Sequence, residues 1–148
     1  MTVRPASAGD VPQWAALRAQ LWPDDGPDAH ADDIVATFLS GDPDQVAFVA
    51  QAADGGLLGF CEASIRHDYV DGCETSPVAF AEGAFIVPEA RGTGIGRALV
   101  EAVAEWGRAK GCTELASNAL LDNTASHAFH EAVGFTETER VVFFRRPL

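Results

Sequence analysis

The chain has 148 residues, 47% of them hydrophobic, and its 22 acidic and 10 basic side chains give a formal net charge of −12. This length and hydrophobic content predict one domain that spans residues 1–148, without linkers or repeats. The negative charge argues against a nucleic-acid partner, and it is compatible either with a cationic ligand or simply with solubility.

The first half of the chain predicts strands that alternate with helices. Apolar residues recur at helical spacing after Asp10, which is a candidate helix cap, and a second helical stretch follows. Two apolar stretches around a glycine turn then indicate an antiparallel hairpin. In chain order these elements are Thr2–Pro5 (strand), Val11–Trp22 and Asp32–Leu39 (helices), and Val46–Ala52 and Leu57–Arg66 (strands).

The second half opens with a polar segment, His67–Pro77, and continues with the apolar strand Val78–Val87. A glycine-rich turn then leads into an amphipathic helix that ends near Lys110–Gly111. The remaining predicted elements are a strand at Thr113–Ser117, a helix at Thr124–Val133 and a final strand at Arg140–Arg145.

The glycine-rich turn has the character of a phosphate cradle. Three glycines within five positions leave backbone N–H groups uncovered, and the helix that follows presents its positive end to an anion. The turn lacks the Gly-Lys-Ser/Thr ending of a P-loop, and its G-x-G-x-G spacing differs from the dinucleotide fingerprint. The segment that we expect to bind a pyrophosphate is Arg91, Gly92, Thr93, Gly94, Ile95, Gly96 and Arg97.

A second motif reads Asn123-x-x-Ser126-x-x-x-His130-x-x-x-Gly134-Phe135. Together with the glycine turn, it resembles the signature of the Gcn5-related N-acetyltransferase (GNAT) superfamily. The resemblance implies an α/β (α+β) fold, the GNAT acyltransferase fold, whose mixed central sheet splays open around acetyl-CoA. It also implies acetyl-CoA as cosubstrate, with a contact from Asn123.

Glu82 is the only charged residue in the apolar strand Val78–Val87. A carboxylate there is costly unless it faces a polar cavity, a cation or solvent. If it faces the cavity, Glu82 is a candidate to bind a substrate ammonium and to accept its proton as a general base.

Two further groups complete the catalytic hypothesis. The backbone N–H groups of Ala84, Phe85, Ile86 and Val87 are candidate oxyanion and pantetheine donors. His130 stands where the family commonly has a tyrosine, so it is a candidate acid for the departing thiolate. A packed or exposed histidine without a catalytic role is an equally good interpretation, because a thiolate can leave without a dedicated acid.

The resemblance narrows to the aminoglycoside 6'-N-acetyltransferases. It rests on three segments, which lie within Trp14–Pro23, at Ala63–Pro77 and at Phe135–Val141. It implies a homodimer and an aminoglycoside site built from carboxylates and aromatic faces, which suit a polycation. The residues implied to bind the drug are Trp22, Tyr69, Glu82 and Glu139, with Asn118 in place of the subfamily's aspartate.

Other sequence features limit the remaining possibilities. The segment Met1–Pro5 lacks the pattern of a signal peptide, and no apolar run is long enough to span a membrane, so we expect a cytoplasmic protein. The three cysteines are odd in number and lack metal-ligand spacing, so we expect free thiols and no metal site. Two other functions remain open: acetylation of another cationic amine, such as a polyamine or an amino sugar, and a non-catalytic acyl-CoA-binding module.

Overall fold

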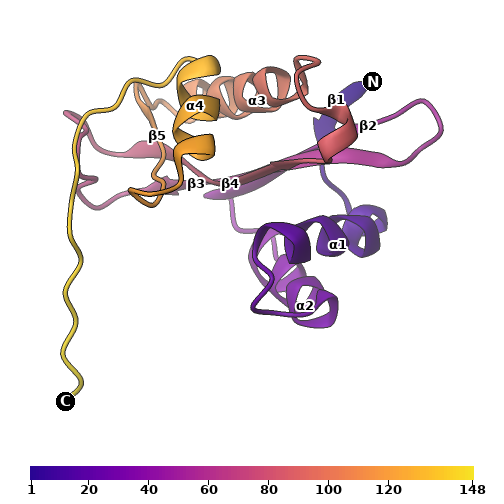
Figure 1. Cartoon of the computed structure of the whole chain (residues 1–148), viewed down its shortest axis with the longest axis horizontal. Helices are drawn as coiled ribbons and strands as arrows, with labels where there is room; N and C mark the ends of the chain where they lie inside the picture. Colours follow the sequence, from indigo (N-terminus) through magenta and orange to yellow (C-terminus); the bar gives the residue numbers. More distant parts are fainter.

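The computed structural model describes residues 1–148 and is built around one five-stranded sheet (Figure 1). The strands follow one another across the sheet in chain order; neighbours are antiparallel except for the last pair, which is parallel. This arrangement confirms the predicted mixed sheet. The strands are β1 (Thr2–Pro5), β2 (Gln45–Gln51), β3 (Leu57–Arg66), β4 (Val78–Ile86) and β5 (Leu115–Ala116).

Helices cover both faces of the sheet. Figure 1 shows α1 (Val11–Leu21) and α2 (Pro27–Phe38) on one face, and α3 (Ile95–Ala109) and α4 (Thr124–Ala132) on the other. Short 3-10 turns precede α1 and α3, at Ala8–Asp10 and Pro88–Ala90. None of these helices combines the length and the apolar character that crossing a bilayer requires.

Two hydrophobic clusters hold these layers together. Trp14, Ile34 and Phe60, all fully buried, join α1 and α2 to β3. On the opposite face, Leu99 and Val103 of α3 belong to a cluster that includes residues of β2, β3 and β4. Burying side chains of this size contributes roughly 1.5–3 kcal/mol each, so the sheet and its four helices form one packed body.

The register between β3 and β4 contains a β-bulge at Glu82. Glu62 pairs with Gly83 and Ala63 pairs with Ala81, so Glu82 is the extra residue on β4. A bulge of this kind bends its strand and changes the direction in which a side chain points. It therefore gives Glu82 a position that strict alternation along the strand would not.

The parallel pairing of β4 with β5 is short. Only Ala79 with Leu115 and Phe80 with Ala116 are paired, so the predicted strand Thr113–Ser117 is reduced to two residues. Beyond Ala116 no ladder continues, and the sheet opens between the two strands. The predicted splay lies at this point.

One predicted helix start needs correction. The second helix begins at Pro27 and not at Asp32, because Gly26 is its N-cap and proline is well suited to the first helical position. Asp10 stands at the N-cap of α1, as expected, but its side chain makes no capping hydrogen bond: its carboxylate accepts hydrogen bonds from the Ser7 backbone N–H, at 2.8 Å, and from Arg4.

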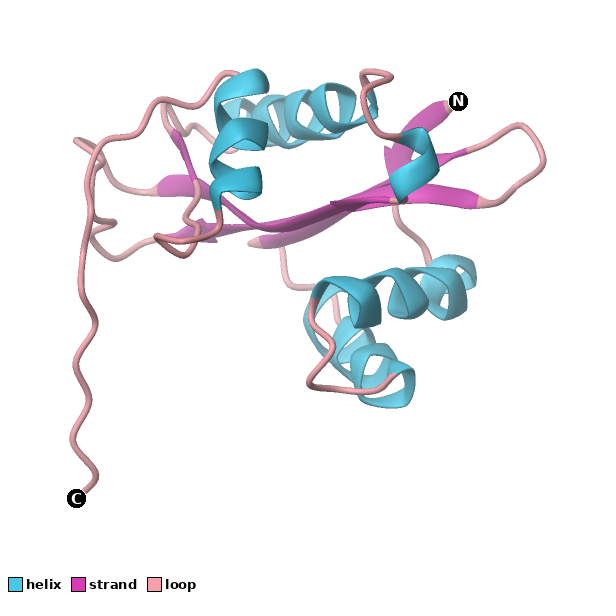
Figure 2. Ribbon diagram, in the orientation of Figure 1, coloured by secondary structure: helices cyan, strands magenta, loops and turns pink.

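The predicted final strand at Arg140–Arg145 is wrong. Residues 136–148 form neither strand nor helix, and the last part of this segment extends away from the body of the molecule (Figures 1 and 2). The middle of the segment, Val141–Phe144, is apolar, as a strand would be, and Phe143 and Phe144 are 84% and 92% exposed. A strand needs a neighbour to satisfy its backbone groups, and no other segment of this chain pairs with this one.

Candidate active site

The glycine-rich turn connects β4 to α3 as predicted. Gly92 and Gly94 have φ of 75° and 89°, in the left-handed region that favours glycine, and Gly94 is the N-cap of α3. A Cβ atom at either position would meet no other atom within 4 Å, so both glycines border open space. The turn therefore offers bare backbone at a helix N-terminus, which is the geometry that binds phosphate groups.

Other residues of this turn have additional structural roles. A Cβ on Gly96 would lie 2.6 Å from the Phe129 ring, so this glycine lets α4 pack against α3. The Arg91 Nε donates to the Ile86 carbonyl at 2.9 Å, and Arg97 donates to the Ala132 carbonyl of α4. Both guanidinium groups are thus oriented by backbone oxygens, and both residues are exposed beside the turn.

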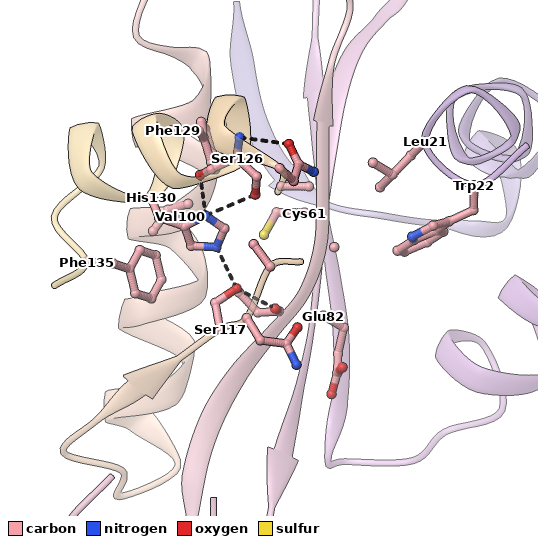
Figure 3. Close-up of a pocket in the computed structure, with 16 residues that line it drawn as sticks. Leu21, Trp22, Cys61, Glu82, Val100, Ser117, Ser126, Phe129, His130 and Phe135 are labelled. Atoms are coloured by element: carbon pink, nitrogen blue, oxygen red, sulfur yellow. Dashed lines mark hydrogen bonds between the residues drawn. The ribbon is translucent and has the colours of Figure 1, made fainter. Parts of the chain in front are cut away.

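A hollow of about 210 Å³ lies where β4 and β5 separate (Figure 3). In Figure 3, Leu21 at the end of α1 and Trp22 just after it lie on one side of the hollow, whereas Ser126, Phe129 and His130 belong to α4. The hollow brings together many of the residues that the sequence singled out. These are Trp22, Glu82, Ala84, Asn118, Asn123 and His130.

Tyr69 and Glu139 do not line this hollow. Tyr69 is 72% exposed on the loop that precedes β4, and Glu139 is exposed at the start of the C-terminal tail. The two segments do meet, because a Cβ on Gly72 would lie 2.2 Å from the Thr138 hydroxyl and 3.7 Å from the Glu139 Cβ. Their predicted contact with substrate therefore remains a prediction.

Glu82 is not the isolated charge that the sequence indicated. Its carboxylate accepts hydrogen bonds from the Ser64 hydroxyl at 2.6 Å and from the Arg66 Nε at 3.0 Å and Nη2 at 2.7 Å. Ser64 and Arg66 lie on β3, which the strand pairing places beside β4. The sequence could not reveal this ion pair, because it depends on the register and on the bulge. About a third of the Glu82 side chain remains exposed, so a substrate cation can reach it.

Trp22 packs against β4 beside the bulge. A Cβ on Gly83 would lie 2.4 Å from the indole ring, so the missing side chain makes room for it. The Arg18 guanidinium lies 5.1 Å from the centre of the same ring, and the His30 ring stacks on it at 6.4 Å. The Trp22 indole thus forms a positioned aromatic wall of the hollow.

A buried polar cluster lies next to Trp22, and no pattern in the sequence indicated it. Glu62, only 2% exposed, accepts a hydrogen bond from the Trp14 indole at 2.8 Å and lies 3.4 Å from the Arg18 Nε. Arg18 also pairs with Asp33 of α2 at 2.7 Å. Burial raises the pKa of Glu62 to about 7, because the opposing effects of Arg18 and Trp14 only partly offset desolvation.

His130 is held on both sides of its ring. Its Nε2 lies 2.8 Å from the Ser117 hydroxyl, and its Nδ1 lies 2.6 Å from the Ser126 carbonyl (Figure 3). The rings of Phe129 and Phe135 contact it edge-on. The ring is therefore packed and oriented, and it also lines the hollow.

The two asparagines differ in what they contact. The Asn123 side chain accepts a hydrogen bond from the Ser126 backbone N–H and so caps α4. Asn118 lines the hollow, and its exposed side chain makes no hydrogen bond within the chain. Asn123 therefore has a structural role beside the predicted CoA contact, whereas Asn118 is available to a ligand.

The predicted backbone donors on β4 divide into two pairs. The Val87 N–H donates to the Leu58 carbonyl of β3 at 2.9 Å, so it is not available to a ligand. Backbone groups alternate in direction along a strand, which turns the Phe85 N–H toward β3 as well. The same alternation turns the N–H groups of Ala84 and Ile86 to the open edge of β4, where the oxyanion donors were expected.

Comparison with known proteins agrees with this geometry. The profile of the Acetyltransferase (GNAT) family matches residues 11–135. Aminoglycoside N(6')-acetyltransferase type 1 of Stenotrophomonas maltophilia is 48% identical to the chain, an alignment that covers 99% of the chain and 94% of that relative. The protein of the same name from Salmonella typhimurium is 44% identical, with 99% of both sequences covered.

Solved structures show the same relationship. AAC(6')-Iy in complex with the bisubstrate analogue CoA-S-monomethyl-acetylneamine superposes with a TM-score of 0.91 at 44% identity, covering 99% of this chain and 98% of that one. The aminoglycoside 6'-N-acetyltransferase AAC(6')-Ih of Acinetobacter baumannii superposes with a TM-score of 0.94 at 42% identity and the same coverage. The phosphate turn, the splayed mixed sheet and the full-length similarity lead to one conclusion: the chain belongs to the GNAT family of acetyltransferases.

Proposed function

We propose that residues 1–148 act as one acetyltransferase domain that moves the acetyl group of acetyl-CoA to the 6'-amino group of aminoglycoside antibiotics, and so confers resistance. The observation that carries this proposal is the hollow at the β4–β5 opening. It combines the Glu82 carboxylate, the Trp22 indole and the free amide of Asn118 beside open backbone N–H groups. Relatives named for this activity match the chain over its whole length.

On the donor side, the turn at Gly92 and Gly94 binds the pyrophosphate of acetyl-CoA. Its backbone N–H groups and the N-terminus of α3 supply the positive field, and Arg91 and Arg97 stand beside it. Asn123, at the edge of the hollow, adds a polar contact. With its pyrophosphate held at the turn, acetyl-CoA directs its thioester toward the opening between β4 and β5.

On the acceptor side, the site suits a cation rich in hydroxyl groups. Glu82 binds the ammonium group and accepts its proton, directly or through water, and Trp22 provides a flat face for a sugar ring. Tyr69 and Glu139 contact more distant parts of the drug. The chain's net charge of −12 favours the approach of a polycation.

The chemistry then needs charge stabilisation at two atoms. The N–H groups of Ala84 and Ile86 face the open edge of β4 and stabilise the negative charge that develops on the thioester oxygen. His130 is oriented toward the same hollow and supplies a proton to the sulfur that leaves. Both groups are fixed by the fold before substrate arrives, which reduces the cost of reorganisation.

A thiol-release assay tests this function. Purified protein with acetyl-CoA should release free thiol with kanamycin, tobramycin or neamine, and mass spectrometry should show one added acetyl group on the 6'-amine. Release with a polyamine or a simple amino sugar alone would instead establish the alternative acceptor. Tight binding of CoA without release with any amine would establish a non-catalytic acyl-CoA-binding module.

The C-terminal tail supports a homodimer. Its residues Val142, Phe143 and Phe144 are 77–92% exposed, and β5 leaves one edge of the sheet unpaired. An exposed apolar segment beside an open edge is a template for pairing between chains. We expect the tail of one protomer to add to the sheet of a second copy.

Light scattering tests the assembly. The wild-type protein should have the mass of two chains, and a Phe143→Ser and Phe144→Ser double variant should have the mass of one. Val35→Ser is a matched control, because Val35 is a half-exposed apolar residue on α2, away from the tail. A monomeric wild type would contradict the dimer and would leave the proposed reaction standing.

The state of the cysteines supports a cytoplasmic location. Cys61, Cys73 and Cys112 are all free thiols, and the first and last are buried. Reduced cysteines are typical of proteins in the cytoplasm. Activity in the soluble fraction of fractionated cells would test the location.

A further inference from the structure

Ser117 occupies the point at which the sheet opens. The ladder between β4 and β5 ends with Phe80 paired to Ala116. One residue further, the contact with β4 is made by a side chain in place of a backbone group: the Ser117 hydroxyl lies 3.1 Å from the Ala81 carbonyl. The Ser117 hydroxyl therefore lies at the apex of the opening and lines the hollow.

The same hydroxyl contacts His130. It lies 2.8 Å from Nε2, on the side of the ring opposite to Nδ1. The Ser126 carbonyl, 2.6 Å from Nδ1, can only accept a hydrogen bond, so Nδ1 carries a proton. This assigns the neutral ring as the Nδ1–H tautomer and leaves Nε2 free to exchange a proton with Ser117.

Counting hydrogens shows how the three groups are connected. When the ring is neutral, Ser117 donates its only hydrogen to Nε2, and the Ala81 carbonyl receives none from it. When the ring is a cation, Nε2 donates to the Ser117 oxygen, and the hydroxyl hydrogen is free for Ala81 or for a ligand in the hollow. All three contacts are hydrogen bonds at once only when both ring nitrogens carry a proton, and the hydroxyl hydrogen of Ser117 then points to Ala81 or to a ligand in the hollow.

We propose that Ser117 is a catalytic proton relay, which passes a proton from the His130 imidazolium to the sulfur of the departing CoA. As the C–S bond breaks, Ser117 donates its hydroxyl hydrogen to the sulfur and takes the Nε2 hydrogen of His130 in return. Ser117 keeps its hydroxyl, His130 becomes neutral with its proton on Nδ1, and the thiolate becomes a thiol. Solvent restores the His130 proton, and Glu82 releases the proton of the acceptor amine to solvent.

This relay rests on the proposed acetyl transfer, and single-turnover kinetics at saturating acetyl-CoA and kanamycin test it. Ser117→Ala should slow the transfer step by about tenfold, below the 10²–10⁴-fold typical of general acids because a thiolate leaves readily. Ser117→Thr keeps the hydroxyl and should recover most of the rate. Ser40→Ala is the matched control, because Ser40 is an exposed serine just after α2 that does not line the hollow, and its loss should leave the rate unchanged.

Two further readouts separate the relay from a purely structural role. The solvent deuterium effect on the transfer step should shrink in Ser117→Ala, because the relay moves two exchangeable protons. In the free wild-type protein, ¹⁵N spectra of His130 at alkaline pH should show the proton on Nδ1. A calorimetric titration with CoA and a thermal melt establish that the variant folds and binds its donor.

The outcomes are distinct. A wild-type transfer rate in folded Ser117→Ala, or a loss confined to CoA affinity, overturns the relay and leaves Ser117 as a tether between the strands. A neutral His130 with its proton on Nε2 also overturns it. Absence of thiol release by the wild-type protein with every aminoglycoside would instead overturn the proposed function, whatever the His130 spectrum shows.

Discussion

Replacement of Glu62 by glutamine should change how the stability of the protein depends on pH. The Glu62 carboxyl is 2% exposed, receives a hydrogen bond from Trp14 and lies beside the Arg18 guanidinium. Desolvation is the largest influence on its pKa, which rises from 4.5 to about 7. Glutamine has nearly the same size and can accept the Trp14 hydrogen bond, but it does not titrate.

The magnitude follows from the two pKa values. A pKa that rises from 4.5 to about 7, at about 1.4 kcal/mol per pH unit, corresponds to roughly 3 kcal/mol. The folded protein binds this proton more tightly than the unfolded chain does. The resulting stabilisation is therefore complete below about pH 4.5, decreases as the pH rises, and is lost above about pH 7.

Urea unfolding between pH 4.5 and 8 measures this effect. The free energy of unfolding of the wild type, minus that of Glu62→Gln, should fall by roughly 3 kcal/mol across the range. Glutamine and the protonated Glu62 carboxyl differ in stability by an amount that does not depend on pH, so only the slope is diagnostic. Glu101→Gln is the matched control, because Glu101 forms an exposed pair with Arg108. A difference that stays constant with pH would refute a proton bound at Glu62.

Four substitutions test the site itself. Gly83→Ala places a methyl group where the Trp22 ring lies, so KM for the aminoglycoside should rise by about tenfold while KM for acetyl-CoA is unchanged. Equal changes in both KM values would contradict a role of Trp22 in binding the aminoglycoside alone. Glu82→Gln should lower kcat/KM by ~10²-fold or more, and an unchanged pH profile would exclude its role as base. Gly94→Val, at φ 89°, should weaken acetyl-CoA binding in calorimetry, and a folded variant with normal affinity would remove the phosphate-turn assignment. Asn118→Asp should lower KM for kanamycin by ~5-fold through a charge-assisted bond, an effect that added salt reduces; unchanged KM values would argue against a cation at this position.

The sequence by itself determined the parts of this protein that depend on local order. The strand, glycine turn and helix around Gly94 are adjacent in the chain, so their spacing alone predicts a phosphate site. The hydrophobic periodicity of α1 and α3 likewise follows from residues within a few turns of one another. For the same reason the Asn123 to Phe135 motif was recognisable as one short helix with its cap and its terminal glycine.

Tertiary structure decided which distant residues meet. The pairing of Glu82 with Arg66 needs the β3–β4 register and the bulge, and the contact of Ser117 with His130 needs β5 to end beside α4. Neither spacing nor composition encodes such contacts, because they depend on how separate elements pack. Val141–Phe144 of the C-terminal tail has the β-prone, apolar composition of a strand and yet is not one within this chain. Composition states only what a segment prefers, whereas a strand exists only where a neighbour supplies its hydrogen bonds.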